Sequence, residues 1–179
     1  GLNLIVNRGK TIFLCDTSVI EYPDAKQLAE MAKSAARVVR LFGFDPKIAF
    51  LSHSTFGEPA TDRTKRLSDA VEILKKDNVD FKFDGEMQPD VALEEVYKEL
   101  YPFSEIVGSS NVLIMPSQHS AAISYKMIKS MSRAKVIGPL LVGLGQPIEI
   151  APLRSSTSDI INLASIAAYS ADVIQYKKN

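Results

Sequence analysis

The sequence contains only one cysteine, Cys15, among its 179 residues. A single cysteine cannot form a disulfide within the chain, so the sequence favours a reducing, cytoplasmic setting. A surplus of charge of one sign is also missing, because 21 lysines and arginines balance 21 aspartates and glutamates. Nucleic-acid binding needs a basic surplus that displaces counterions, and we therefore expect no nucleic-acid partner.

No apolar run reaches the roughly 18 residues that a membrane-spanning helix needs, so we expect no membrane partner. Residues 1–6 also lack the basic leader and the apolar length of a signal peptide. The absence of an initiator methionine indicates a piece of a longer protein. The length fits one compact domain of roughly 100–200 residues.

Short apolar runs alternate with amphipathic stretches, which is the pattern of an α/β fold. The short runs predict strands at 11–15, 47–51, 79–84 and 111–115. The amphipathic stretches predict helices at 24–42, 62–76, 91–100, 120–131 and 156–174. We expect a mostly parallel sheet covered on both faces by helices, a three-layer αβα arrangement, with ligands at the carboxyl ends of the strands.

The helix predicted at 120–131 carries apolar residues at helical spacing. We expect four of them to face the core: Ile123, Met127, Ile128 and Met131. After this helix, the runs 136–139 and 147–150 frame a glycine-rich connection.

Two phosphate-binding signatures each fail at one residue. Gly143-Leu144-Gly145 would need a further glycine for a dinucleotide fingerprint, and Ile148 stands there. Gly138 and Gly143 have the spacing of a phosphate-binding loop, but Leu144 takes the place of its lysine. These glycines indicate tight turns.

Three other groups of residues each have two interpretations. His53 and His119 each follow a predicted strand, where they would act as acid–base or metal-binding groups or would be ordinary loop residues. Because no further ligands stand at metal-binding spacing, we predict no metal site. Asp84 and Glu86 stand at a strand end, where they would bind Mg²⁺ or transfer protons, or would only cap the next helix. Cys15 fits a small core residue better than a nucleophile.

The richest polar cluster is Arg154-Ser155-Ser156-Thr157-Ser158-Asp159, at the start of the last predicted helix. Its hydroxyls, its backbone N–H groups and the helix dipole suit an anion, and Arg154 adds a bidentate contact. A Ser/Thr N-cap followed by an aspartate also begins a helix without any ligand. The residues alone leave both interpretations open.

Six stretches, taken in order, resemble the phosphate acetyl/butyryltransferase, or phosphotransacetylase, family. They are Phe13–Val19, Asp24–Ala29, Leu51–Thr55, Asp84–Asp90, Asn111–Pro116 and Ile137–Leu144. The resemblance implies a fold like that of isocitrate and isopropylmalate dehydrogenases, with two α/β lobes and a crevice between them. It further implies that residues 1–150 form the C-terminal lobe, and that residues 151–179 form a crevice loop and a last helix packed on the missing N-terminal lobe.

This resemblance implies transfer of an acetyl group between phosphate and coenzyme A. The family enzymes carry a Ser-Arg-Gly run and, six residues after its arginine, an aspartate proposed to take the thiol proton. Matching that aspartate to Asp159 puts Pro152 and Leu153 at the serine and arginine positions, with Arg154 displaced by one. A missing guanidinium removes charge stabilisation of the transition state. Asp159 is therefore expected to be catalytic only if transacetylase activity is retained.

With Pro152 and Leu153 in place of serine and arginine, the sequence is similar to the C-terminal domain of hybrid bacterial NADP-dependent malic enzymes. The same similarity is seen in Asp16–Val19, Phe56-Gly57 and Ser158–Ala164. That resemblance implies a domain that binds acetyl-CoA or CoA, inhibits the conversion of malate to pyruvate and CO₂, and contributes to a homo-oligomer. The expected ligand-binding residues are Arg154, Ser155, Ser156, Thr157, Lys126, Gly138 and Pro139.

The same resemblance places NADP and a divalent metal in N-terminal malic enzyme domains, in cis but outside this chain. Two alternatives stand beside the sensing domain. The chain would otherwise belong to an active phosphate acetyltransferase, or it would be a purely structural oligomerisation lobe.

Overall fold

The computed structural model describes residues 1–176 of the chain, which form one sheet with helices around it. The elements are, in chain order, β1 (Leu2–Asn7), β2 (Lys10–Cys15), α1 (Ala25–Leu41), β3 (Lys47–Leu51), α2 (Asp62–Lys76), β4 (Lys82–Met87), α3 (Pro89–Leu93), the 3₁₀ helix η1 (Glu95–Glu99), β5 (Val112–Ile114), α4 (Gln118–Met131), β6 (Lys135–Leu140) and α5 (Thr157–Tyr176).

The sheet has six strands in the order β4-β3-β5-β2-β1-β6. Neighbouring strands among β4, β3, β5 and β2 pair in parallel, whereas β1 lies antiparallel between β2 and β6. The predicted mostly parallel sheet is confirmed, but the sequence pattern did not predict β1. A two-residue turn joins β1 to β2, and its residues Arg8 and Gly9 both have positive φ angles, as such hairpin turns require.

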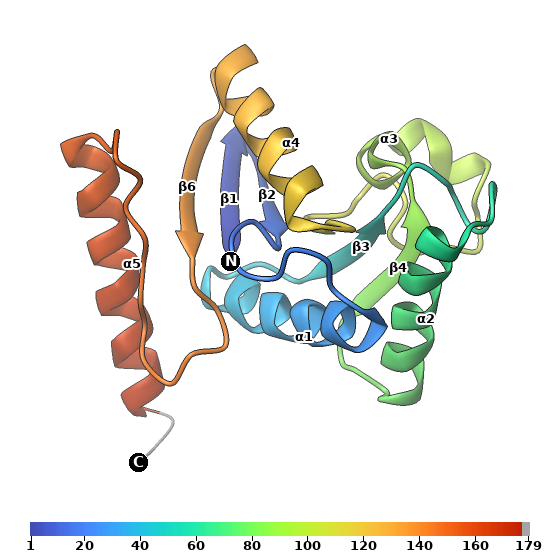
Figure 1. The fold of residues 1–179 in the computed structure, drawn as a ribbon, viewed down its shortest axis with the longest axis horizontal. Coiled ribbons are helices and arrows are strands. Elements are labelled where there is room, and N and C mark those ends of the chain that lie inside the picture. The colour runs from blue at the N-terminus through green and yellow to red at the C-terminus, as the bar shows by residue number, and fades with distance from the viewer. Residues whose placement is uncertain (177–179) are drawn as a thin grey trace.

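Helices cover both faces of the sheet (Figure 1). On one face α1 and α2 pack against Phe13, Ile48 and Phe50, and on the other α3 and α4 pack against Leu14 and Ala49. Successive strand residues point to opposite faces, so Phe13 and Leu14 belong to different cores. The expected three-layer αβα arrangement is confirmed.

The helix predicted at 24–42 is the most closely matched element. Asp24 is its N-cap and accepts a hydrogen bond from Gln27 N, while the Gln27 side chain accepts one from Asp24 N. This capping box satisfies two of the free backbone donors at the helix start. One side of α1 is buried through Leu28, Ala29, Met31, Ala32, Ala35, Ala36 and Val39.

The strand predicted at 79–84 in fact covers Lys82–Met87, which corrects the interpretation of its carboxylates. Asp84 and Glu86 lie within β4, and Glu86 is only 1% exposed. Glu86 accepts hydrogen bonds from Ser54 Oγ at 2.9 Å, Gly57 N at 2.7 Å and Ser68 Oγ at 2.9 Å. Glu86 therefore neither caps a helix nor faces solvent; it ties the loop after β3 to β4 and α2.

Two predicted helices differ from the structure. The helix predicted at 91–100 is divided into α3 and η1, because Glu94 between them has an extended backbone. In α4 the stripe expected to face the core is exposed, at 49% for Ile123, 53% for Met127, 38% for Ile128 and 81% for Met131. The helix packs instead through Ala121 and, one turn later, the partly buried Tyr125.

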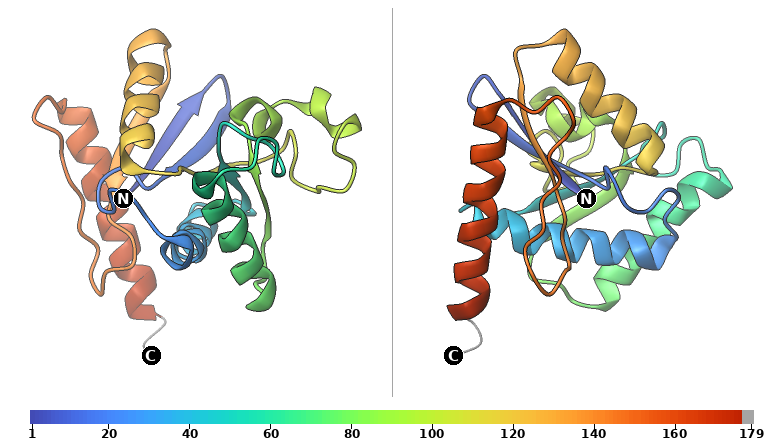
Figure 2. Two further views of the ribbon diagram at one scale, coloured as in Figure 1. Left: turned by 45° about the vertical axis from the view of Figure 1, so that its right-hand side comes forward. Right: turned by 60° about the vertical axis from the view of Figure 1, so that its left-hand side comes forward.

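Helix α5 stands beside β6, and the connection between them, residues 141–156, runs back along the helix (Figures 1 and 2). Leu163 is its buried contact with the core, whereas Ile160, Ile161 and Tyr169 are all more than half exposed. In the segment 151–179, which we predicted to form a crevice loop and a last helix packed on a missing lobe, residues 177–179 lie outside the described part. No helix within residues 1–176 has both the length and the hydrophobicity needed to cross a bilayer.

Replacing Glu86 by alanine should lower the free energy of unfolding by about 2–4 kcal/mol, because it leaves two hydroxyls and one N–H without their acceptor. Urea unfolding followed by circular dichroism measures the change. Glu72→Ala is the matched control: Glu72 is exposed, its carboxylate is ion-paired with Lys75, and its loss should lower stability far less than the loss of Glu86. Equal effects of the two variants would contradict an anchoring role for Glu86.

Candidate functional site

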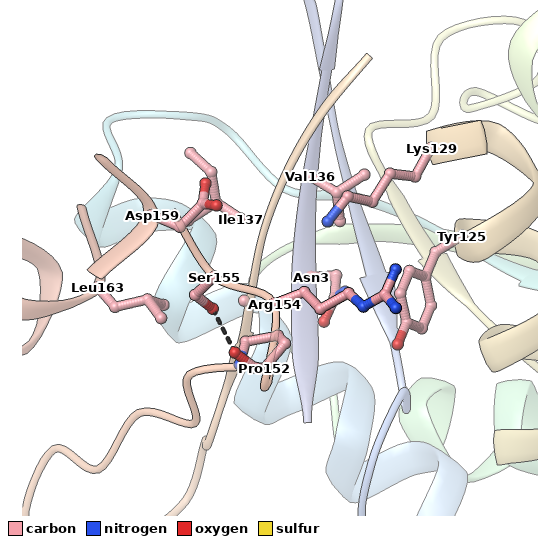
Figure 3. A pocket seen from close by; sticks show the side chains of 11 residues that line it. Asn3, Tyr125, Lys129, Val136, Ile137, Pro152, Arg154, Ser155, Asp159 and Leu163 are labelled. Carbon is pink, nitrogen blue, oxygen red and sulfur yellow. Dashed lines mark hydrogen bonds between the residues drawn. The ribbon is translucent and has the colours of Figure 1, made fainter. Parts of the chain in front are cut away.

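A small pocket lies where β1, β6, α4 and the start of α5 meet (Figure 3). Its lining combines basic, amide, hydroxyl and apolar groups from Asn3, Tyr125, Lys129, Val136, Ile137, Gly138, Pro152, Arg154, Ser155, Asp159 and Leu163. The cavity volume is about 80 Å³. Pockets that enclose a whole drug-sized ligand measure roughly 300–1,000 Å³, so this one suits a single small group of a larger ligand.

Arg154 and Lys129 supply the positive charge of this pocket. Arg154 extends from the 141–156 connection towards Tyr125, and Lys129 reaches in from α4 (Figure 3). Neither side chain forms an ion pair with any residue between 1 and 176. Two unpaired cations that share a cavity attract an anion, and Arg154 has the donor geometry for a carboxylate or phosphate.

Asn3 and Gly138 form the floor of the pocket. Asn3 is 1% exposed, and its Oδ1 accepts a hydrogen bond from Thr17 Oγ1 at 2.9 Å. No hydrogen bond from its Nδ2 is found within residues 1–176, so this amide group remains as a donor for a ligand. Gly138 has φ +123°, and a Cβ there would meet Leu2 O at 2.8 Å and Asn3 Oδ1 at 3.0 Å. Only glycine allows this close approach of β6 to β1.

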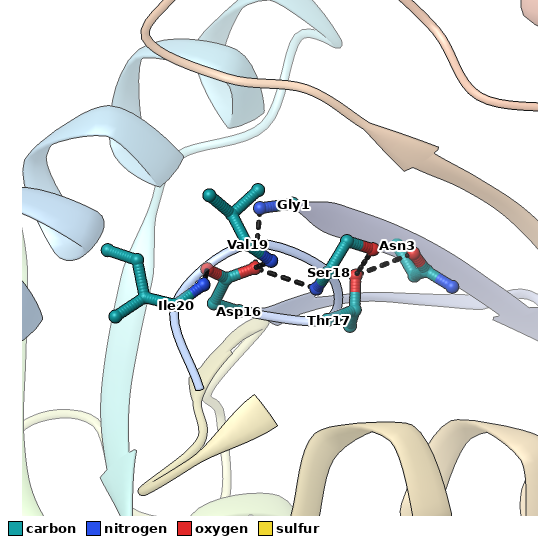
Figure 4. Close-up of polar contacts among 7 residues, drawn as sticks. All are labelled: Gly1, Asn3, Asp16, Thr17, Ser18, Val19 and Ile20. Carbon is teal, nitrogen blue, oxygen red and sulfur yellow. Dashed lines mark hydrogen bonds and ion pairs between the residues drawn. The ribbon is translucent and has the colours of Figure 1, made fainter. Parts of the chain in front are cut away.

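The turn after β2 holds Thr17 in place through Asp16 (Figure 4). Asp16 Oδ1 accepts hydrogen bonds from Ser18 N and Val19 N, and Oδ2 accepts one from Ile20 N. Burial acts to raise the pKa of Asp16, whereas the bonds from the Ser18 and Ile20 backbone act to lower it. The carboxylate therefore fixes the turn from which Thr17 reaches Asn3.

The hydroxyls of Ser155 and Ser156, just before α5, are engaged within the chain. Ser155 Oγ donates to Pro152 O at 2.7 Å. Ser156 N and Oγ donate to Asp159 Oδ2 at 2.9 and 2.8 Å, and Asp159 N donates back to Ser156 Oγ at 3.2 Å. This is the geometry of a capping box, so the helix-cap interpretation holds for Ser156 and Asp159.

Asp159 is a weaker base than an ordinary aspartate. Hydrogen bonds from the Ser156 backbone and side chain lower its pKa, and the nearby Lys129 and Lys135 lower it further. A general base works best when its pKa lies near the working pH, so the cap reduces its capacity to take a proton. Figure 3 shows the Arg154 side chain extending away from Asp159.

The structure brings only some of the residues expected from the sequence to this pocket. Arg154, Ser155, Asp159 and Gly138 line it. Ser156 caps α5, and Thr157 is its exposed first residue. Pro139 lies in β6, and its carbonyl oxygen accepts a hydrogen bond from Ile150 N of the connection. Lys126 is exposed, with its Nζ 5.8 Å from the centre of the Tyr125 ring.

Sequence patterns did not identify Asn3, Tyr125 or Lys129. Tyr125 and Lys129 follow the buried Ala121 at steps of four, which places all three on one helical face. That spacing was the available signal. The more apolar stripe of the helix was expected to face the core, and that expectation was wrong.

The remaining candidates lie apart from this pocket. Cys15 is 5% exposed, and burial raises its pKa to about 12, so it is a core residue, as expected. His53 lines a second cavity near the ends of β3 and β5, whereas His119 is exposed in the first turn of α4. Within the described part of the chain, no three His, Cys, Asp or Glu residues gather as metal ligands.

Glu149 lies in the connection that carries Arg154. It pairs with Leu140 at the end of β6, in surroundings that include Val38, Phe42 and Ile166. Its Oε2 is buried without a hydrogen-bond partner in residues 1–176. Burial raises the pKa of Glu149 to about 7, although a hydrogen bond from the Leu141 backbone acts to lower it.

Stability should therefore decrease as the pH rises from about 5 to about 8, because the unfolded chain, with a pKa near the ordinary 4.5, ionises Glu149 more readily than the folded chain. This contribution is complete below the unfolded pKa and is lost as the pH passes the folded one. Other groups titrate as well, so the decisive quantity is the difference from Glu149→Gln. The variant should lose less stability over this range in urea unfolding; parallel curves would contradict the raised pKa.

Comparison with known proteins gives a consistent set of relatives. The family model "Phosphate acetyl/butaryl transferase" matches residues 1–168. The chain is 45% identical over 171 residues to the NADP-dependent malic enzyme of Rhizobium meliloti, covering 96% of this chain and 22% of that protein. It is 34% identical over 169 residues to the phosphate acetyltransferase of Bacillus subtilis, covering 93% of this chain and 52% of that protein.

Among solved structures, a phosphotransacetylase from Streptococcus pyogenes superimposes with a TM-score of 0.89 at 33% identity, over 96% of this chain and 53% of that one. The chain thus spans about a fifth of the malic enzymes and about half of the acetyltransferases that it matches.

Proposed function

Because this chain belongs to the phosphate acetyl/butaryl transferase family, we propose that it is the acetyl-CoA-sensing and oligomerisation domain of a multidomain NADP-dependent malic enzyme. The parent protein would convert malate to pyruvate and CO₂ in malic enzyme domains N-terminal to this chain. NADP and a divalent metal would bind in those domains. The protein would work in the cytoplasm, and the 45% identity to a malic enzyme supports this parent over the acetyltransferases.

The observation that carries the proposal is that Arg154 and Lys129 line one pocket together with the amide of Asn3. These groups fit one anionic part of acetyl-CoA or CoA, a phosphate, and the small volume leaves the rest of the ligand outside. Gly138 contributes through its missing side chain, since a Cβ would displace Asn3. Ser155 and Ser156 shape the loop that presents Arg154.

The same residues support binding without turnover. Pro152 and Leu153 stand where the acetyltransferase pattern has serine and arginine, and the Leu153 side chain is fully exposed. Asp159, the remaining member of that pattern, is held in the cap of α5 with a lowered pKa. Charge on a transferring phosphate would therefore lack its positioned guanidinium, and the thiol would lack an effective base.

Regulation requires acetyl-CoA to bind one arrangement of the whole protein more tightly than the other. A tenfold difference in affinity corresponds to about 1.4 kcal/mol of coupling. Arg154 and Lys129 come from different elements, a connection and α4, so the anion contact depends on how these elements are placed.

The assembly role is proposed for α4. Its outer stripe, Ile123, Met127, Ile128 and Met131, is exposed and apolar in the single chain. Contiguous apolar surface of this kind is typical of contacts with another protein, and in a homo-oligomer a second copy would cover it.

In the full-length protein, Arg154→Ala should weaken inhibition of malate turnover by acetyl-CoA by about tenfold or more, because it removes a charge-assisted contact. Uninhibited turnover should be unchanged, because Arg154 lies in the sensing domain. Inhibition curves with and without acetyl-CoA measure both quantities.

Lys129→Ala should act in the same direction as Arg154→Ala, and Lys126→Ala is the matched control on the same helix. The control should leave inhibition within about twofold of the wild type, since an exposed lysine outside a site contributes little. Unchanged inhibition in both Arg154→Ala and Lys129→Ala would remove this pocket from acetyl-CoA sensing.

An active phosphate acetyltransferase remains the second candidate, because Asp159 is retained and a phosphate acetyltransferase is 34% identical over 169 residues. Incubation of the full-length protein with acetyl phosphate and CoA separates the two functions. We expect no acetyl-CoA above the level in a blank without protein. Turnover that is abolished by Asp159→Asn would establish the enzyme instead. If the full-length protein shows neither turnover nor acetyl-CoA binding, the chain would be a purely structural oligomerisation lobe.

A further inference from the structure

A second cavity, of about 410 Å³, opens at the carboxyl ends of the parallel strands. Its walls come from Ser52 and His53 after β3, Met115 and Ser117 after β5, and Arg63 on α2. None of these residues lines the Arg154 pocket, which involves the later residues 125 and 129 of α4. The volume lies in the range of sites that enclose a small-molecule ligand.

This cavity coincides with a reversal in the topology of the sheet. β3 and β5 are parallel neighbours. The chain leaves β3 for α2 on one face of the sheet and leaves β5 for α4 on the other face. Connections that diverge in this way leave a crevice outside the carboxyl ends of the two strands, and open α/β sheets bind their ligands in such crevices.

The polar groups of the cavity suit an anion. Arg63 is exposed and forms no ion pair with residues 1–176, and His53 lines the same cavity. Ser54 Oγ gives its one hydrogen to Glu86 Oε1, so Ser52 Oγ donates to Ser54 Oγ at 3.1 Å and accepts from Ser54 N at 3.3 Å. Ser52 is therefore engaged within the chain, and Arg63 and His53 remain for a ligand. No aspartate or glutamate is among the described residues that line the cavity.

The remaining wall suits a flat ring. Tyr22 is 59% exposed, and the Arg66 guanidinium lies 3.7 Å from the centre of its ring, so one face of the ring is held and the other is open. Arg66 also donates to Pro23 O and Pro116 O, which fixes both edges of this wall. The buried side chains of Leu67 and Met115 supply apolar surface beside it. A tyrosine face next to a cation is a common way to stack a nucleobase.

We propose that this switch-point cavity binds a phosphorylated nucleoside, with its base against Tyr22 and its phosphate at Arg63 and His53. The ligand chemistry has two sources, a free nucleotide or the nucleotide half of coenzyme A. The site is separate from the Arg154 pocket, and a test of one does not decide the other.

Isothermal calorimetry of the full-length protein with AMP tests the proposal, with adenosine as the comparison that lacks the phosphate. AMP should bind saturably and at least about tenfold more tightly than adenosine. Arg63→Gln should weaken AMP binding about tenfold, and Tyr22→Leu should also weaken it, because the ring is lost while apolar bulk is kept. Lys65→Gln, an exposed neighbour on α2 outside the lining, is the matched control and should bind AMP like the wild type.

All three variants alter exposed or half-exposed side chains, and equal thermal midpoints would establish that they fold. Absence of AMP binding, or AMP binding that Arg63→Gln and Tyr22→Leu leave unchanged, would overturn the proposal. A competition titration then separates the two sources. Displacement of AMP by CoA would assign the cavity to the nucleotide half of the coenzyme, and simultaneous binding would assign it to a free nucleotide.

Discussion

The pairing of β1 with both β2 and β6 is the constraint on which the site depends. β1 runs against the direction of its two neighbours, and its hydrogen bonds place β6 at the edge of the sheet. Leu2 and Leu4 bury one side of the strand, while Asn3 turns a polar group to the other side, under the pocket. Without this strand, neither the pocket floor nor the connection that carries Arg154 would have a fixed position.

Much of the fold could be predicted from the spacing of apolar residues, because in a long amphipathic segment that spacing indicates which side is buried. Helix α1 and strands β3 and β5 lie within a residue or two of their expected ranges. β1 was missed although its partner β2 follows after a two-residue turn. Its other partner, β6, lies more than 120 residues away, and no local pattern reveals that pairing. β4 was misplaced because the sequence Asp84-Gly85-Glu86 is typical of a loop. Glu86 can be buried in a strand only because the hydroxyls of Ser54 and Ser68, distant in the sequence, donate hydrogen bonds to it.

Only some of the pocket residues could be predicted from the sequence. The cluster 154–159 stood out by composition, and composition does not distinguish a hydroxyl that binds a ligand from one that caps a helix. The structure assigns Ser156 and Asp159 to the cap and leaves Arg154 free of ion pairs in residues 1–176. Lys129 could be chosen over Lys126 only once the inner face of α4 was known. A stripe of apolar residues marks that face in a helix that is covered on one side, but α4 exposes its apolar stripe.

Helix α5 is held to the lobe by a narrow contact around Leu163, while Ile160, Ile161 and Tyr169 face outward. Arg154 lies three residues before this helix, and Lys129 belongs to the main body of the lobe. The separation of the two cations is thus a measure of where α5 stands relative to the sheet. An anion that contacts both cations favours one position of the helix. If the anion thereby changes the affinity of α5 for a partner on its outer face, that partner changes the affinity for the anion by the same factor.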